Sequence, residues 1–512
     1  MLSAVHSSRA QSLSIGVALV PGIVASVWYL ASAYRSSGAL GFPLDDSWIH
    51  AQFARNLATG HGFTYTGSDW VAGSTAPAWT VLLAAGYFVL RNIVSAAVVW
   101  GTLLQATAGY YAFRLTQLLD VPRGVSLLAG TLVALAPVIT WGAVAGMEVN
   151  LAAALVLAGL YYHFADRRSG RQSVRGAALL GTSVLARPEN LALVAIVLLG
   201  EWIATESLGL RARRFARAAV VAGAVSALLV IFSYLTIGRP LPTTFYAKSG
   251  PGIVRAIETR DAGMIERNLQ TFGPQAVQNM WLILRDQFSW GAFVAAAGAA
   301  VLLVRRTHLR VSLTLIAVLV AVPFAMGLTA PQRLKVDNVR YAGQLVVLAA
   351  PLLVAGVWHT FRAWPLPALI VAAVCATVAW QTVERARPYA LAVKNIQELH
   401  VRTGRWIAEN LPPGAVVAVN DVGAIAYFGR RRILDLEGLV SPEVLPYRNL
   451  PDRGQQVVRA MRPDYLVIFP GWYPDLSNDP AFQEIHRVSI ADNIISAGDT
   501  LVVYRAPWTP ER

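Results

Sequence analysis

Two adjacent carboxylates, Asp45 and Asp46, follow Pro43 shortly after the first long apolar run of the chain. Neighbouring like charges repel and a low-dielectric membrane disfavours ionisation, so at least one carboxyl pKa should rise unless a cation lies nearby. Such a carboxylate acts as a general base towards a hydroxyl group or helps to hold a divalent cation. The structural alternative is that Asp46 alone is the N-cap of a helix over 47–58. The pair favours the chemical role.

Further ionisable and aromatic residues stand at the ends of apolar runs, where they would border a common site. They are His50, Arg55 and His61 in the same loop, Glu148 before one run, Arg187 and Glu189 between two others, Phe245, Tyr246 and Lys248 after the run 216–237, and Arg340 with Tyr341 at the start of the run 341–361. Ionisable groups at membrane depth are costly and usually functional. Lys248 would neutralise a phosphate, and Phe245 and Tyr246 would line a sugar or a lipid. Taken singly, each has a structural alternative as a solvated turn, a hydrogen-bonded histidine or an interface anchor.

The composition places these residues in a membrane protein. Of the 512 residues, 55% are hydrophobic and only 14% are charged, whereas soluble domains carry about 25% charged residues. Such a chain cannot cover its apolar surface in a water-soluble globule, so membrane lipids are expected partners. The net charge of +14 falls in short clusters between apolar runs; it does not form one stripe, which argues against nucleic acid as a partner. The single cysteine, Cys375, allows no intrachain disulfide.

The apolar runs predict eleven membrane crossings within a membrane module over residues 1–381. The first run, 13–34, is followed by polar chain and lacks a small-residue cleavage site, which indicates an anchor. The others cover about 96–113, 124–142, 149–165, 174–187, 190–204, 216–237, 287–304, 311–328, 341–361 and 365–381. Each is near the ~20 residues that span a bilayer, although two of them are short.

Charge decides the role of one more apolar stretch, 76–90. If this stretch does not cross and the N-terminus is cytoplasmic, the arginine clusters near 114–123, 167–175, 211–217 and 305–310 all face the cytoplasm, as the positive-inside rule requires. We therefore expect a re-entrant or interfacial helix within a long first external loop, 35–95. Eleven crossings from a cytoplasmic N-terminus place the C-terminal domain on the outer side of the membrane, together with the first external loop. We therefore expect a multi-pass protein of the inner (plasma) membrane whose candidate site and C-terminal domain are extracytoplasmic.

The remaining residues, 382–512, are charged and punctuated by proline, and they predict a soluble α/β domain. A helix is expected over 392–410, stopped by Pro412-Pro-Gly. Strands are expected over 415–419, 432–436, 465–469 and 501–504. Asp421-Val-Gly-Ala follows a strand and precedes a helix as nucleotide-binding turns do, but it lacks the glycine fingerprint.

An ordered set of motifs resembles the signatures of GT-C superfamily glycosyltransferases, in the branch that contains mycobacterial terminal arabinofuranosyltransferases. The set is Phe42-Pro-Leu-Asp-Asp, Ala54-Arg-Asn-Leu-Ala-Thr-Gly-His-Gly-Phe, Gly73-Ser-Thr-Ala-Pro-Ala-Trp-Thr, Gly146-Met-Glu, Ala186-Arg-Pro-Glu, Pro242-Thr-Thr-Phe-Tyr-Ala-Lys and, in the tail, Asn420-Asp-Val-Gly-Ala-Ile-Ala-Tyr-Phe. The branch commonly has Asn where Thr243 stands and Thr where Val149 stands, which bears on the donor sugar more than on the reaction type.

The resemblance implies a polytopic α-helical transferase that takes a sugar, such as arabinofuranose, from a polyprenyl-phosphate donor to a cell-envelope glycan or lipid acceptor. Asp45 or Asp46 would be the general base, Lys248 and arginines would hold the leaving phosphate, and inversion is expected. A divalent cation (Mg, Mn or Ca) is left open, with Asp45, Asp46 and Glu148 as its candidate ligands. The alternatives are a lipid or polysaccharide transporter, for which no repeat is seen, and a non-catalytic envelope protein.

Overall fold

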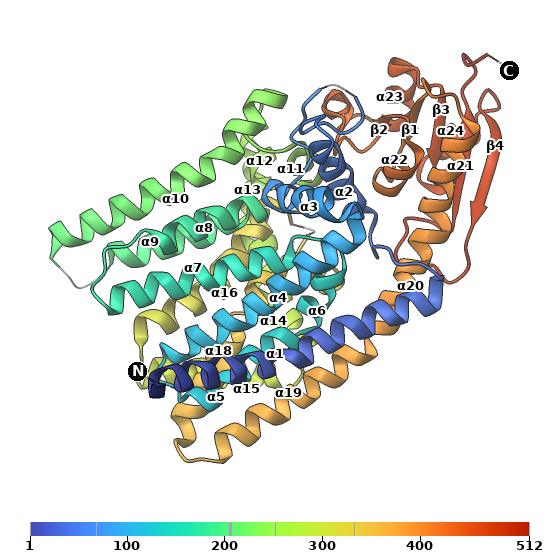
Figure 1. Ribbon diagram of the computed structural model, residues 1–512. Coiled ribbons are helices and arrows are strands. Elements are labelled where there is room, and N and C mark those ends of the chain that lie inside the picture. Colours follow the sequence, from blue (N-terminus) through green and yellow to red (C-terminus); the bar gives the residue numbers. More distant parts are fainter. Residues whose placement is uncertain (1, 68, 204–206, 251, 332, 511–512) are drawn as a thin grey trace.

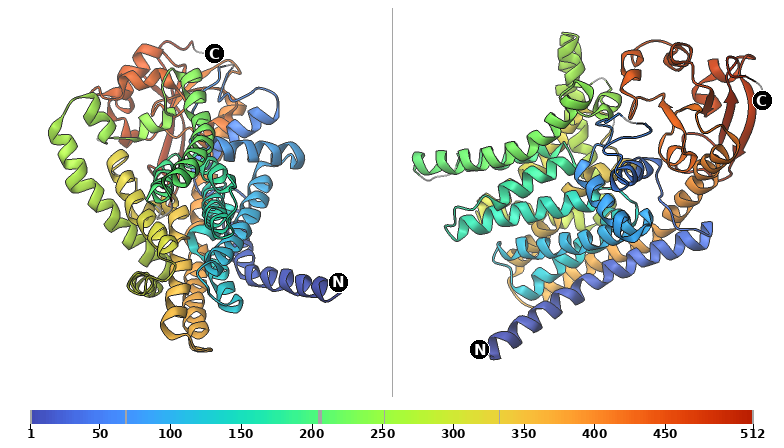
Figure 2. Two further views of the ribbon diagram at one scale, coloured as in Figure 1. Left: turned by 90° about the vertical axis from the view of Figure 1, so that its left-hand side faces the viewer. Right: turned by 45° about the horizontal axis from the view of Figure 1, so that its top comes forward.

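A bundle of helices carries a smaller α/β domain at one end in this computed structural model (Figure 1). The structure describes residues 2–67, 69–203, 207–250, 252–331 and 333–510. The N-terminal end of the chain lies at the opposite end of the bundle from the α/β domain, as the further views also show (Figure 2). The candidate residues lie at the end of the bundle that meets this domain.

Helices of different lengths form the bundle. They are α1 (Leu2–Ser37), α4 (Ile93–Gln117), α5 (Arg123–Leu135), α6 (Pro137–Val144), α7 (Val149–Arg168), α8 (Arg175–Ala186), α9 (Asn190–Trp202), α10 (Leu208–Ile237), α14 (Gly273–Phe288), α15 (Gly291–Val304), α16 (Leu309–Thr329), α17 (Gly343–Val346), α18 (Ala349–Phe361) and α19 (Leu366–Glu384). Within the described ranges, five helices are long and apolar enough to cross a membrane, or up to eight if each of three bent pairs is one span. The chain is thus a multi-pass membrane protein, and the count of eleven crossings stays a prediction.

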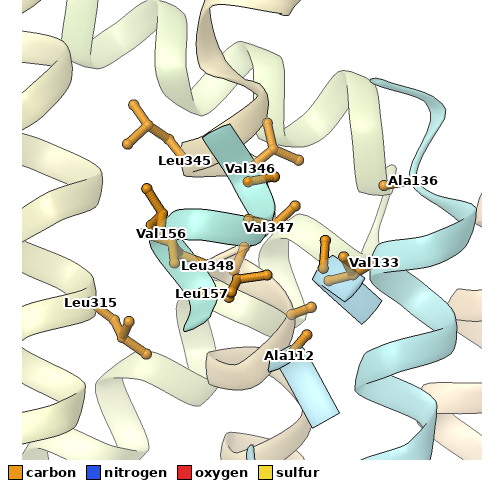
Figure 3. Close-up of a cluster of buried hydrophobic side chains, with 14 of the residues drawn as sticks. Ala112, Val133, Ala136, Val156, Leu157, Leu315, Leu345, Val346, Val347 and Leu348 are labelled. Atoms are coloured by element: carbon orange, nitrogen blue, oxygen red, sulfur yellow. The ribbon is translucent and has the colours of Figure 1, made fainter. Parts of the chain in front are cut away.

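Small and branched apolar side chains fill the centre of the bundle. Figure 3 shows Ala112 of α4, Val133 of α5, Val156 of α7 and Leu315 of α16 around the segment Leu345–Leu348. Lipid tails are as apolar as these side chains, so close packing and not the hydrophobic effect holds such helices together. Glycines permit the closest approach, and a Cβ on Gly356 of α18 would lie 2.0 Å from the Cα of Gly298 on α15.

Further helices lie between these along the chain. They are α2 (Asp45–Ala58), α3 (Pro77–Leu90), α11 (Thr243–Lys248), α12 (Ile253–Glu258), α13 (Ala262–Arg267), the π-helical η1 (Asn268–Phe272) and the 3-10 helix η2 (Val336–Ala342). The helices expected over 47–58 and 76–90 are confirmed as α2 and α3. The N-cap assignment is wrong, because Leu44 is the N-cap of α2 and both Asp45 and Asp46 lie inside its first turn without capping it.

The α/β domain begins on a continuous helix and not on a linker. Helix α19 runs on through α20 (Ala386–Ile396), the π-helical η3 (Gln397–Val401) and α21 (Arg402–Asn410), so that one helical segment covers Leu366–Asn410. It ends just before Pro412, as expected. The expected boundary at 381–382 therefore falls within a helix.

A mixed five-stranded sheet forms the core of this domain. Its elements are β1 (Val416–Val419), α22 (Gly423–Gly429), β2 (Arg432–Asp435), the 3-10 helix η4 (Pro442–Tyr447), α23 (Arg453–Met461), β3 (Tyr465–Ile468), the 3-10 helix η5 (Pro470–Trp472), α24 (Pro474–Ser477), β4 (Gln483–Ser489) and β5 (Thr500–Arg505). The strand order is β2-β1-β3-β5-β4, with β1, β2 and β3 parallel and the other pairings antiparallel. All four expected strands are confirmed, and edge strand β4 was missed because it is mostly polar and exposed.

The domain docks on the bundle through α2. The carboxylate of Asp45 accepts hydrogen bonds from the backbone N–H groups of Gly423 (2.6 Å) and Ala424 (2.8 Å) at the start of α22. The unpaired N–H groups and the dipole at a helix start both favour a negative charge there. A Cβ on residue 423 would lie 2.0 Å from the backbone oxygen of Asp45, so only glycine permits this approach.

We predict that Gly423→Ala loosens the docking of the domain. The added methyl group must displace the backbone of Asp45, and such overpacking typically costs about 1–3 kcal/mol. The purified protein should unfold at a lower temperature, and limited proteolysis should release the domain earlier. Gly414→Ala is the matched control, because a Cβ there would meet no atom within 4 Å. Equal behaviour of the two variants would contradict this account of the docking.

Candidate active site

A cavity of about 510 Å³ lies where α2, α9, α11, α16 and η2 meet. Nine of the expected site residues line it: Asp46, His50, Glu148, Arg187, Glu189, Phe245, Lys248, Arg340 and Tyr341. One wall is apolar and is formed by side chains of α9 and α16, among them Leu191, Ala195 and Met326. The cavity therefore combines a cluster of charges with a surface suited to a lipid chain.

Asp46 is the carboxylate that faces this cavity. Its Oδ2 atom lies 2.7 Å from Nη2 of Arg340 and 3.2 Å from Nζ of Lys248. Burial alone would raise the pKa of Asp46, but the charges and hydrogen bonds of Lys248 and Arg340 hold it well below its usual range. Nη1 of Arg340 is buried without a hydrogen-bond partner, so the guanidinium keeps a donor for a further anion.

Asp45 has the opposite environment. Both of its oxygens are engaged by the start of α22, and the residue does not line the cavity. Burial raises the pKa of Asp45 to about 6, with the charge of His400 opposing the rise and that of Asp421 adding to it. His400 and Asp421 themselves form a pair at 2.9 Å. At least one carboxyl pKa was expected to rise unless a cation lay nearby: the pKa of Asp45 is raised, and that of Asp46, which contacts two cations, is lowered.

Glu148 is held in a buried network behind Asp46. Its Oε1 lies 2.7 Å from Nη2 of Arg187, and its Oε2 lies 3.4 Å from Nε2 of His50. Nη2 of Arg187 also donates to the backbone oxygen of Arg340 at 3.1 Å. His50 is fixed from its other side, where Nδ1 lies 3.2 Å from Oγ of Ser74. The network thereby connects α2 to the residue that pairs with Asp46.

The turn that carries Glu148 is fastened to α2 and α3. Gly146 has a φ of +72°, a conformation that favours glycine. Its backbone oxygen accepts from Nε1 of Trp79 at 2.9 Å, and the backbone oxygen of Ala145 accepts from Oγ of Ser47 at 2.7 Å. The Gly-Met-Glu motif therefore positions Glu148, which explains the glycine of the motif.

Four expected site residues lie away from the cavity lining. Asp45 is described above. Arg55 donates to the backbone oxygen of Tyr427 at 2.8 Å and stacks over that ring, so it joins α2 to the α/β domain. His61 lies in a separate surface pocket beside Arg430–Arg432, and Tyr246 lies under the guanidinium of Arg239.

Sequence reasoning missed other residues of the cavity, among them Ser249 and Arg333. Both fall in expected loops, Ser249 directly after Lys248 and Arg333 seven residues before Arg340. A basic residue in such a loop was the only signal for Arg333. Thr243, which departs from the motif of the resembled branch, is fully buried and donates to the backbone oxygen of Ala72 at 3.1 Å. Its side chain does not line the cavity.

The residues present do not form a ready site for a divalent cation. Within the described part of the chain, no group of three or more His, Cys, Asp or Glu residues is placed to hold a metal ion. Asp46 is already paired with two cations, Glu148 is paired with Arg187, and Asp45 is bonded to α22. A cation would have to displace Lys248 and Arg340 from Asp46.

The arrangement is similar in fold to three solved structures of membrane enzymes. The oligosaccharyltransferase of Archaeoglobus fulgidus, solved with Zn and sulfate, matches with a TM-score of 0.57 and 14% identity over 88% of this chain and 67% of that chain. ArnT from Cupriavidus metallidurans, bound to undecaprenyl phosphate, matches with a TM-score of 0.56 and 14% identity over 96% of this chain and 98% of that chain. The Archaeoglobus oligosaccharyltransferase AglB, with an inhibitory peptide and dolichol-phosphate, matches with a TM-score of 0.54 and 12% identity over 88% of this chain and 69% of that chain.

These neighbours are GT-C glycosyltransferases, and the chain has their fold, as its motifs predicted. At 12–14% identity the likeness establishes the fold alone. A family described as a domain of unknown function (DUF8728) matches residues 393–504, which form most of the α/β domain. No protein of curated function matches the sequence.

We predict that Arg187→Gln destabilises the protein strongly. It would leave the carboxylate of Glu148, which is 2% exposed, without its strongest partner, and breaking a buried pair in this way typically costs about 3–5 kcal/mol. Thermal unfolding should show a large decrease in stability, and adding Glu148→Gln should recover part of it. The control is Arg487→Gln, which removes an exposed pair with Glu484 and should leave the unfolding temperature unchanged. If the unfolding temperature of Arg187→Gln fell no further than that of the control, the network would be ruled out as a structural element.

Proposed function

We propose that the protein is a membrane glycosyltransferase that moves a sugar from a polyprenyl-phosphate donor to a glycan or lipid acceptor of the cell envelope. The observation that carries this proposal is the contact of Asp46 with Lys248 and Arg340 inside a cavity that also has an apolar wall. Such a site offers a base, two cations for a phosphate and a surface for a lipid chain. A transporter would not require this concentration of cations around the carboxylate of Asp46.

In this proposal the donor phosphate binds to Lys248 and Arg340. Preorganised cations at a developing negative charge usually supply the largest part of catalysis, because they need no reorganisation during the reaction. The unpartnered Nη1 of Arg340 offers one hydrogen bond, and Lys248 offers a mobile point charge. The polyprenyl chain would follow the apolar side chains of α9 and α16.

Asp46 is the proposed general base. The acceptor hydroxyl gives its proton to the carboxylate of Asp46, its oxygen forms a bond to the anomeric carbon, and the bond from that carbon to the phosphate oxygen breaks with inversion. The lipid phosphate leaves with the electron pair. Before the donor binds, the low pKa of Asp46 makes it a weak base. A phosphate that draws Lys248 and Arg340 to itself would raise this pKa and activate the carboxylate.

Asp45, the other candidate base, is a positioning residue in this proposal. Its oxygens are bonded to Gly423 and Ala424, so it would fix the first turn of α2 and thereby the place of Asp46. The proposed donor sugar is arabinofuranose, on the motifs shared with the arabinofuranosyltransferase branch. The proposed location of the cavity and the α/β domain is the extracytoplasmic side of the inner membrane.

The first test is Asp46→Asn in a transfer assay with polyprenyl-phosphate sugars and mass spectrometry of the products. General bases contribute about 10²–10⁴-fold, so we expect a loss of that size with undecaprenyl-phosphate binding retained. Asp45→Asn should cost less in rate and more in thermal stability. Asp120→Asn, which follows α4 at its other end, is the control and should keep full activity. Normal turnover by Asp46→Asn would refute the base assignment.

A second test uses the pH dependence of the rate. The deprotonated carboxylate is the active form, so activity is lost as pH falls through the pKa of Asp46. Because this pKa is held low in the free protein and should rise with donor bound, the acid limb of kcat should lie at higher pH than that of kcat/KM for the donor. Lys248→Gln removes one cation and should move the kcat/KM limb to higher pH. Donor-induced activation would be contradicted if the acid limbs of kcat and kcat/KM lay at the same pH and the kcat/KM limb of Lys248→Gln did not move.

A further inference from the structure

A second group of cations lies beside the cavity, apart from the pair that holds Asp46. Arg333 lines the cavity, and its Nε donates to the backbone oxygen of Lys248 at 3.4 Å. Arg448, which follows η4 in the α/β domain, donates from Nη1 to Oγ of Ser249 at 3.4 Å, and Ser249 also lines the cavity. Arg255 on α12 follows the lining residue Val254. We name Arg255, Arg333 and Arg448 the rim arginines.

The rim arginines are half-buried and repel one another. Burial lowers the pKa of the Arg448 guanidinium, and the charges of Arg255, Arg453 and Arg333 lower it further. Arg453 has its own carboxylate, since its Nη2 lies 2.6 Å from Oε1 of Glu437. Glu437 also accepts a hydrogen bond from the hydroxyl of Tyr473 at 2.8 Å.

The rim arginines have no such carboxylate. Within the described residues, all the ion pairs of the cavity and of the neighbouring domain surface involve other cations. Three guanidinium groups that come from α12, the loop after α16 and the α/β domain therefore lie near one another without an ion pair of their own, and the charge of Glu437, which is paired with Arg453, also acts on Arg448. Like charges at half-buried positions cost stability, and an anion bound between them would offset this cost.

From this convergence we propose that the rim arginines bind a second anionic group, distinct from the donor phosphate assigned to Lys248 and Arg340. Guanidinium groups hold phosphate and carboxylate oxygens through paired N–H donors, so either group fits. The group would be carried by the donor, as the second phosphate of a polyprenyl diphosphate, or by the acceptor, as a phosphate or carboxylate on the glycan. The identity of the ligand as a donor or an acceptor rests on the proposed function, whereas the anion site itself does not.

The position of the rim suits both sources. Arg333 contacts the backbone of Lys248, so a group joined directly to the donor phosphate would reach it. Arg448 belongs to the α/β domain and contacts Ser249 of the cavity lining, so an anionic group on an acceptor bound in the cavity would reach it. The proposal also gives the domain a role in substrate binding beyond its hold on Asp45.

The experiment measures ligand affinity of the full-length protein in lipid nanodiscs. Wild type and the double variant Arg333→Gln/Arg448→Gln are titrated with undecaprenyl monophosphate and with undecaprenyl diphosphate. Both are then saturated with the monophosphate and titrated with an oligosaccharide that carries glucuronate. Arg459→Gln is the matched control, because Arg459 lies on α23 of the same domain with its side chain 62% exposed. Thermal unfolding verifies that each variant is folded.

A second phosphate of the donor is indicated if wild type binds the diphosphate about tenfold more tightly than the monophosphate and the double variant loses this difference. An anionic acceptor is indicated if the oligosaccharide binds beside the monophosphate and about tenfold more weakly to the double variant. If neither affinity changes in a folded double variant, the proposal is overturned. Failure of the proposed function would give a different result: wild type would not bind the monophosphate, or Lys248→Gln would not weaken the binding of the monophosphate.

Discussion

The hydrogen bonds between the carboxylate of Asp45 and the first N–H groups of α22 are the contact on which the candidate site depends. They join the first turn of α2 to a domain that lies 378 residues further along the chain. Asp46 is the next residue on α2, so its direction into the cavity follows from this contact. Lys248 and Arg340 can meet Asp46 only while the domain, α11 and η2 are held around that turn. The α/β domain is therefore part of the site's architecture.

Two identical residues side by side acquire opposite properties from this arrangement. The carboxyl pKa of Asp45 is raised to about 6 by burial, whereas that of Asp46 is depressed by two cations. The carboxylate of Asp45 positions the helix. The carboxylate of Asp46 stays ionised in contact with Lys248 and Arg340, the two cations to which a phosphate would bind. A donor that binds by competition for Lys248 and Arg340 would itself generate the base, so transfer would depend on prior donor binding. This coupling would keep Asp46 a weak base until the donor is bound.

Local patterns predicted much of the fold and most of the cavity. Apolar runs, the Pro412 stop and the short apolar stretches of β1, β2, β3 and β5 depend on near neighbours in sequence. So do the ends of runs where Glu148, Arg187, Lys248 and Arg340 stand. The division of labour between Asp45 and Asp46 could not be predicted, because Gly423 and Ala424 are remote in sequence and backbone N–H groups leave no trace in side-chain patterns. For the same reason Arg448 was missed: only the docking of the domain brings it to Ser249.

A structure of the full-length protein with undecaprenyl phosphate bound tests the central claim most directly. The account predicts the phosphate between Lys248 and Arg340, the polyprenyl chain along α9 and α16, and Asp46 released from at least one of its two cations and turned towards the acceptor space. It also predicts that the contact of Asp45 with α22 is unchanged. A phosphate bound elsewhere, with Asp46 still paired to both Lys248 and Arg340, would contradict it.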